Sequence, residues 1–189
     1  MHSDGNINKN QIRLRINKQD KEILELFNKS LNSNIEIKDE PNNIVNLTIN
    51  SVKMVNDLKK YGIVENKTNT INFYNFNDKK LTDSYIRGIF DGDGWCYFSE
   101  NSREIGFSGN LQTCTGLLQY LKETYNIPNL KITTVKSIYR IRICNKIGIC
   151  LLYENIFKGH RDLSLKRKFD KIENFAVSKR AFKNRKTTL

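Results

Sequence analysis

The feature that most constrains the fold is an internal repeat, in which two halves of roughly 90 residues share one order of strands and helices. Residues 11–17 alternate apolar and polar side chains, which is typical of a strand with one buried face. Apolar residues recur at helical spacing over 20–31, which predicts an amphipathic helix. We expect strands over 34–38 and 44–50 and a helix over 51–62 to complete the first half. The pattern predicts an α+β fold.

A helix over 81–94 joins the halves, and the same order then repeats. We therefore expect a first repeat over 1–80 and a second over 81–168. A basic tail over 169–189 is either an additional phosphate-binding arm or a frayed basic terminus. The elements expected after 81–94 are strands over 95–100 and 104–109, a helix over 113–125, strands over 130–135 and 137–144, and a helix over 146–157.

Charge indicates the class of partner. Lys and Arg number 32 against 20 Asp and Glu, which gives a net charge of +12. Such a chain usually meets a polyanion, most often nucleic acid, although a Lys- and Asn-rich proteome would also explain part of the bias. Arg, Asn and Thr on the polar faces of paired strands suit the DNA major groove. The candidate DNA-contacting residues are Arg13, Arg15, Asn46, Thr48, Lys67, Arg140, Arg142, Arg167 and Lys168.

Several classes of protein are disfavoured by what the sequence lacks. Its four cysteines form no C-x-x-C pair and its histidines number two, so a zinc site is not expected. No apolar run approaches the ~18–20 residues that span a membrane, and the N-terminus has no apolar leader. We expect a cytoplasmic protein, or one of an organellar matrix or a phage-infected host cell.

The stretch "IFDGDG" (89–94) breaks a local rule, because carboxylates are unfavourable at the negative end of a helix. Gly88 and Gly92 lie four residues apart on one side of that helix and would let a second helix approach closely. Carboxylates brought together by two such helices would make an oxygen-rich site suited to Mg²⁺. Beside a cationic surface, this predicts metal-assisted hydrolysis of a phosphodiester.

"IRGIFDGDG" (86–94) resembles the LAGLIDADG motif of homing endonucleases, and the internal repeat, the Arg-bearing strands, "ENKT" and "LKRK" strengthen the resemblance. It implies two αββαββα repeats that form a saddle over double-stranded DNA, with the motif helices at their interface. It also implies that Asp93, flanked by Gly92, holds Mg²⁺. "HSDGN" matches the end of the same motif, which makes Asp4, preceded by Ser3, the counterpart. Lys18 corresponds to a lysine that supports the hydrolytic water, whereas Asp91 is expected to be structural.

The sequence departs from the motif pattern in two ways. Only the last three residues of the first motif are present, so the helix expected before Asp4 is missing. The second repeat offers only Gly109 and Asn110 where a second lysine would stand. We expect a site-specific Mg²⁺-dependent DNA endonuclease, acting as a monomer or as a homodimer through the motif helix. The alternatives are a non-catalytic DNA-binding regulator and, less favoured, an RNA-binding maturase. Trp95 is expected to pack beneath the motif helix.

Overall fold

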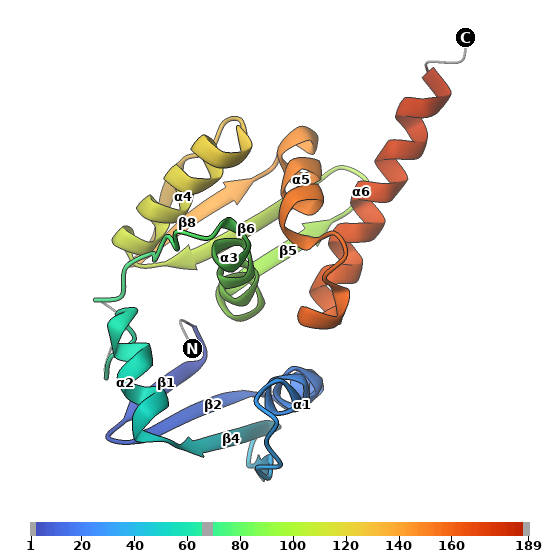
Figure 1. Ribbon diagram of the computed structural model, residues 1–189. Helices are drawn as coiled ribbons and strands as arrows, with labels where there is room; N and C mark the ends of the chain where they lie inside the picture. The colour runs from blue at the N-terminus through green and yellow to red at the C-terminus, as the bar shows by residue number, and fades with distance from the viewer. Residues whose placement is uncertain (1–2, 66–69, 187–189) are drawn as a thin grey trace. The chain divides into compact units, whose positions relative to one another are not determined.

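The computed structural model describes residues 3–65 and 70–186, and the chain divides into two compact units, Met1–Tyr74 and Asn75–Leu189. We call them the first and the second unit and describe each by itself. Figure 1 shows the course of the chain through both.

The first unit contains a four-stranded antiparallel sheet with the strand order β1-β2-β4-β3. Its polar residues Asn17 and Ser51 cap the turns that begin its two helical segments, as short hydrogen-bonding side chains commonly do. Its elements are β1 (Gly5–Asn8), β2 (Gln11–Asn17), a 3-10 turn (Lys18–Asp20), α1 (Lys21–Ser30), β3 (Lys38–Glu40), β4 (Ile44–Asn50) and α2 (Val52–Lys60).

Alternation along β2 and β4 builds the core of this unit. Ile12 and Leu47 are fully buried, and Leu24 of α1 and Val55 of α2 pack in the same cluster. The helices therefore cover the apolar face of the sheet. The prediction of a strand over 34–38 is wrong in its bounds, because Ile35 and Ile37 pack against the core without pairing and the strand begins only at Lys38.

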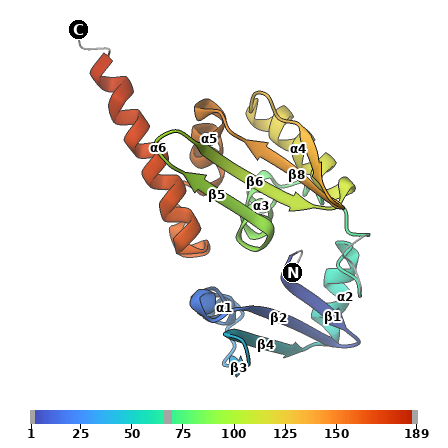
Figure 2. The ribbon, with the colours of Figure 1, turned by 180° about the vertical axis from the view of Figure 1, so that it is seen from behind.

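The second unit repeats the topology, with a four-stranded antiparallel sheet in the order β5-β6-β8-β7. Figure 2 shows this sheet in front of α3, α4 and α5, so these helices cover one face only. Phe90, Phe107 and Phe157 pack edge to face in the layer between. The elements are α3 (Lys79–Asp93), β5 (Gly94–Phe98), β6 (Arg103–Gly109), α4 (Leu111–Tyr125), β7 (Ile132–Val135), β8 (Ile138–Ile143), α5 (Lys146–Leu152), a π-helical turn (Tyr153–Phe157), a 3-10 turn (Arg161–Leu163) and α6 (Lys166–Lys186).

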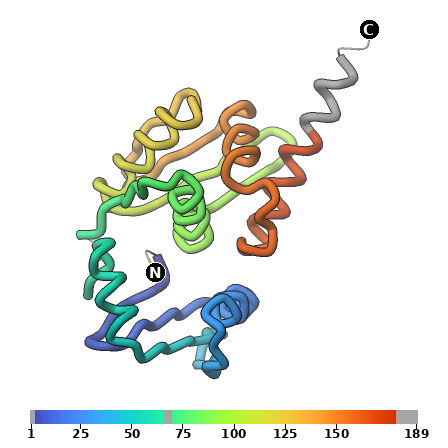
Figure 3. The backbone as a smooth tube through the Cα atoms, in the orientation of Figure 1, coloured from blue at the N-terminus to red at the C-terminus, as the bar shows by residue number. Residues whose placement is uncertain are grey.

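Helix α6 differs from both expectations for the tail. It begins at Lys166, and Phe169, Ile172 and Ala176 are buried in the second unit. The ring of Phe175 stacks on Phe98 of β5 with the centroids 4.6 Å apart. The beginning of the 169–189 segment is thus a packed part of the second unit, as the trace in Figure 3 also indicates. Within the described residues, no helix is both long and apolar enough to cross a membrane.

Candidate metal centre and nucleic-acid face

The C-terminal end of α3 is held by a buried lysine from α6. Lys168 is 7% exposed, and its Nζ donates to the carbonyl oxygens of Phe90, Asp91 and Gly94 at 2.9, 2.7 and 2.7 Å. A cation at this position neutralises the negative end of the helix dipole and adds a donor to the carbonyls of the last turn, of which that of Phe90 also accepts from the backbone N–H of Gly94. This explains how two aspartates can stand in the last turn of α3. The prediction that Lys168 contacts DNA does not agree with its burial.

Asp91 of α3 makes a second contact between α3 and the beginning of α6. Its carboxylate accepts a hydrogen bond from the backbone N–H of Leu165, the residue before α6. Burial raises the pKa of Asp91 to about 6, against the opposing effects of this hydrogen bond and of the nearby Lys168 and Arg87. Asp91 therefore serves the positive end of α6 while Lys168 serves the negative end of α3. This position agrees with a structural role for Asp91.

Asp93 ends α3 and is anchored through its main chain. Its carbonyl oxygen accepts a 2.8 Å hydrogen bond from Ser108 Oγ of β6, and the residue is half-buried. Within the described part of the chain, no hydrogen bond or ion pair engages its carboxylate. The helix end is thus fixed by Lys168 and Ser108 through main-chain oxygens, and metal binding by the Asp93 side chain stays a prediction.

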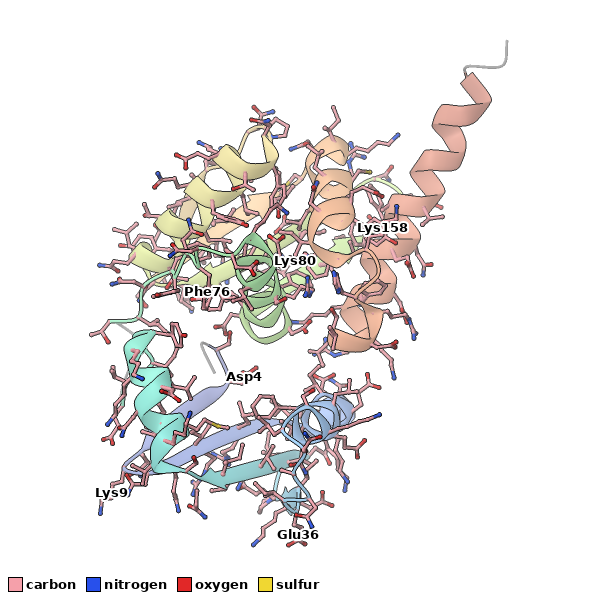
Figure 4. The ribbon with its side chains drawn as sticks, in the orientation of Figure 1. Asp4, Lys9, Glu36, Phe76, Lys80 and Lys158 are labelled. Carbon is pink, nitrogen blue, oxygen red and sulfur yellow. The ribbon has the colours of Figure 1, made fainter. Side chains whose placement is uncertain are left out.

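Asp4 and Asp93 occupy equivalent places in the two units. Gly94 begins β5 and pairs with Phe107 of β6, and Gly5 begins β1 and pairs with Leu14 of β2. The two sheets share one strand order, so Gly5 and Gly94 are equivalent positions. Asp4 and Asp93, the residues directly before these glycines, are therefore equivalent as well. Asp4 is exposed at the start of β1, where Figure 4 labels it.

Asp4 and Asp93 each present one carboxylate directly before the first strand of the sheet in their own unit. Mg²⁺ is usually held by one or two carboxylates together with water and substrate phosphates, so it needs no complete cage of protein ligands. Among the residues that the structure describes, no group of three or more His, Cys, Asp or Glu side chains could hold a metal ion by itself. Ser3 and Gly92, directly before the two aspartates, are half-buried, and Ser3 has a buried side-chain hydroxyl.

Lys18 stands in the 3-10 turn after β2, and its ammonium pairs with Asp39 of β3 at 2.5 Å. The register gives its counterpart in the second unit, because Leu14 corresponds to Phe107 and four further residues lead to Leu111. Asn17 and Asn110 precede these two positions, and both cap the turn that follows. Lys18 of the first unit therefore corresponds to Leu111 of the second. This agrees with the expectation that the second repeat lacks the equivalent lysine.

The polar face of the first sheet carries a regular array of amide, hydroxyl and cationic groups. Arg13 and Arg15 point away from the core, while Ile12 and Leu14 point into it. Arg15 also pairs with Glu40 at 2.6 Å. The cross-strand rows on this face are Asn8–Gln11–Asn50, Asn6–Arg13–Thr48 and Arg15–Asn46–Lys38.

The polar face of the second sheet differs in carrying an aromatic ring beside its arginines. Arg142 pairs with Glu104 of β6, and Arg140 lies 5.5 Å from the centroid of the Trp95 ring. The expectation for Trp95 is wrong, since its ring lies against Gly106 on the sheet rather than beneath α3. Glu104 was missed, although the alternation in "REIGFSG" sets it on the same face as Gly106 and Ser108.

The remaining candidates lie in separate places. Arg167 is exposed in the first turn of α6, and Lys67 lies outside the described residues. Gly88 is exposed on α3, and a Cβ added there would meet no atom within 4 Å. The open space at Gly88 leaves room for the close helix approach that was expected, and none of the helices described in the second unit lies against it.

No family model and no curated protein sequence matches this chain. Solved structures do match its fold. The LAGLIDADG meganuclease I-AabMI bound to uncleaved DNA gives a TM-score of 0.65 at 11% identity over 97% of this chain and 89% of that one. The LAGLIDADG homing endonuclease I-LtrWI bound to target DNA gives a TM-score of 0.59 at 13% identity, over 94% of this chain and 80% of that one. Full-length DUF199/WhiA from Thermatoga maritima gives a TM-score of 0.60 at 17% identity, over 94% of this chain and 57% of that one.

These likenesses confirm the fold that the sequence resemblance implied. The chain has the mixed α+β fold of LAGLIDADG proteins, with two four-stranded antiparallel sheets of identical strand order. At 11–17% identity they establish the fold alone.

Proposed function

We propose that this chain is a site-specific, Mg²⁺-dependent DNA endonuclease that binds double-stranded DNA through the polar faces of its two sheets. The observation that carries the proposal is the equivalence of Asp4 and Asp93, each of which directly precedes the first strand of such a sheet. The solved structures with this fold include LAGLIDADG proteins bound to DNA, which supports the same reading.

Recognition would use the two sheets in different ways. The first sheet offers Arg13, Asn46 and Thr48 on one face, and these are side-chain types that read guanine and adenine edges in the major groove. The second sheet offers Arg140 and Arg142 from β8. Net charge of +12 would draw the protein to DNA before any base is read. Arg167 and Lys67 remain candidates for contacts to phosphate.

Catalysis would combine two carboxylates with one basic side chain. Bound Mg²⁺ would polarise the scissile phosphate and lower the pKa of a coordinated water. Asp93 and Asp4 would hold the ion, and Lys168 and Ser108 would keep the end of α3 in position. Lys18 would place a positive charge near the developing negative charge on phosphate, oriented by its ion pair with Asp39.

We further propose that the exposed side of α3 around Gly88 and Gly92 is the helix interface of the active protein. Small residues at this spacing allow two helix backbones to come close. The partner would be another part of the same chain in a monomer or α3 of a second copy in a homodimer.

The alternative function is a DNA-binding protein without cleavage. Two observations favour it. Lys18 has Leu111 as its counterpart, and Asp4 is exposed and lies just before β1 rather than within an element. Such a protein would retain specific binding in the absence of Mg²⁺ and cut neither strand. A matched RNA competitor in the same assay would reveal a protein that prefers RNA, since A-form RNA hides its deep groove from strands.

The test is a cleavage assay on a plasmid library that carries the DNA flanking the gene. We expect Mg²⁺-dependent cutting at discrete sites by the wild type and none by Asp93→Asn. Asp162→Asn is the matched control, because Asp162 is exposed in the turn before α6 and undergoes the same change of charge. Specific binding by all three proteins without cutting would select the alternative function.

A further inference from the structure

Five residues of the second sheet form a contiguous cluster on its polar face. Trp95 of β5 pairs in register with Gly106 of β6, which in turn pairs with Arg142 of β8. Glu104 accepts a 2.8 Å hydrogen bond from Trp95 Nε1 through one oxygen and pairs with Arg142 through the other. Arg140 lies 5.5 Å from the centroid of the same indole. The cluster therefore links three neighbouring strands.

Gly106 is the residue that allows this arrangement. A Cβ added at this position would lie 2.1 Å from Cζ2 of Trp95 and 2.5 Å from Cε2, closer than any side chain can tolerate. The indole thus fills the space that a side chain at position 106 would need. In the first unit, the register counterparts of Trp95 and Gly106 are Asn6 and Arg13. The same two positions there carry a short amide and a long cation.

An acid at the centre of this face is unexpected in a surface that binds a polyanion. The Glu104 side chain is 16% exposed, whereas its partner Arg142 is 51% exposed. Its hydrogen bond with Arg142 holds the pKa of Glu104 below its ordinary value, so the carboxylate stays charged near neutral pH. Negative charge here weakens attraction to any phosphate backbone, which is a cost shared by every DNA sequence. A contact between the Glu104 carboxylate and a base would offset this weaker attraction to phosphate.

The chemistry of a G·C base pair matches the two charged groups. Guanine presents its N7 and O6 acceptors to an arginine in the major groove, and the N4 amino group of cytosine donates to a carboxylate. Arg142 and Glu104 are already side by side, so one guanidinium and one carboxylate could address the two bases of a single pair. The indole of Trp95 restrains Glu104, because its Nε1 donates a hydrogen bond to that carboxylate, and Glu104 in turn pairs with Arg142.

We propose that Trp95, Glu104 and Arg142 form a base-reading centre specific for a G·C pair, in which Glu104 determines specificity. The inference rests on the proposed DNA binding and deepens it. Glu104 acts in two ways: it accepts from cytosine, and it orients Arg142 toward guanine while keeping it from backbone phosphate. Removing its charge strengthens binding to unrelated DNA and relaxes selectivity at one base pair.

The test uses the tryptophan itself, because the chain contains a single Trp. Its emission reports directly on the second sheet while DNA is titrated. Duplexes would carry the site selected by the wild-type protein, together with each single base-pair change in it. The variants are Glu104→Gln and Arg142→Gln, with Glu25→Gln as a control that removes one negative charge from the exposed face of α1.

We expect the selected duplex to change the emission of the wild type, and one G·C pair to be discriminated at least tenfold. Glu104→Gln should lose most of that discrimination while binding unrelated DNA several-fold more tightly, and its salt dependence should steepen by about one released counterion. Arg142→Gln should lose discrimination at the same base pair. Glu25→Gln should behave as the wild type at every position.

Two outcomes would overturn the inference. Unchanged discrimination at every base pair in both cluster variants, with specific binding intact, would leave the cluster a purely structural feature and the proposed function untouched. A wild type that binds no DNA would overturn the proposed function and the inference together. Thermal unfolding of Glu104→Gln would accompany the titrations, and Arg142→Gln, altered at a half-exposed position, provides the same test if the first variant is unstable.

Discussion

Lys168 shows how far the role of one residue depends on the phase of its helix. "LKRK" reads as a basic cluster, and its three cations are equivalent in the sequence. In the structure, Arg167 is exposed and Lys168 is buried against the carbonyls of Phe90, Asp91 and Gly94. The sequence pattern and the charge cannot distinguish Arg167 from Lys168. Their difference in burial is set by where α6 begins and by how α6 packs on β5.

Replacing the ammonium of Lys168 should be costly. In Lys168→Met, the carbonyl oxygens of Phe90, Asp91 and Gly94 lose the buried ammonium, so we expect a loss of about 2–4 kcal/mol in the free energy of unfolding. Lys171→Met changes an exposed position on the same helix and should stay within about 0.5 kcal/mol of the wild type. Urea titrations of both variants give the comparison. Equal stability of the two would contradict the capping role of Lys168.

At the scale of elements, the strands with strict alternation could be predicted from sequence, and the short or irregular elements could not. Residues 11–17 and 44–50 form β2 and β4 with the predicted bounds. Strand β1 was missed because its four residues, GNIN, contain a single large apolar side chain and therefore show no clear alternation. The π-helical turn Tyr153–Phe157 was read as a continuation of the preceding helix, since its side chains are as apolar as those of a regular turn.

The contact between β5 and β6 makes a sharp prediction about a glycine. Gly106→Ala should displace the indole of Trp95 and destabilise the second unit by about 1–3 kcal/mol, because the added Cβ would sit 2.1 Å from Trp95 Cζ2. Gly109→Ala on the same strand is the matched control, where the nearest atom of Thr113 lies at an ordinary 3.5 Å. Unfolding curves and Trp emission measure both effects. An emission spectrum unchanged by Gly106→Ala would show that the ring does not rest there.

The proposed interface on α3 can be tested apart from stability. Since no atom lies within 4 Å of a Cβ at Gly88, Gly88→Leu should leave the unfolding midpoint close to that of the wild type. It should nevertheless reduce DNA cleavage at least tenfold, because a large side chain prevents close approach of another helix. Lys80→Leu adds a similar side chain at another exposed position of α3, labelled in Figure 4, and should retain activity. Full activity of Gly88→Leu would exclude this face as the interface.

At the scale of the whole molecule, the repeat was the most informative feature of the sequence, and the register supplied what the repeat could not. Two halves with one order of elements predicted two similar units, and both sheets have the same strand order. The equivalence of Asp4 and Asp93 was implied by a three-residue motif remnant and now also follows from the pairing of Gly5 and Gly94. The Arg15–Glu40 pair on the first sheet and the Trp95–Glu104–Arg142 cluster on the second required side-chain positions, because ion pairing across strands leaves no periodic signal.

The measurement that tests the central proposal most directly is Mg²⁺-dependent cleavage of an end-labelled duplex by the wild type, Asp4→Asn, Asp93→Asn and the double variant. If the two carboxylates act as one centre, each single variant should lose nearly as much activity as the double variant, while all four proteins bind the duplex with similar affinity. Cleavage by Asp93→Asn at the wild-type rate would contradict the account, because the carboxylate at the end of α3 would then have no part in the reaction.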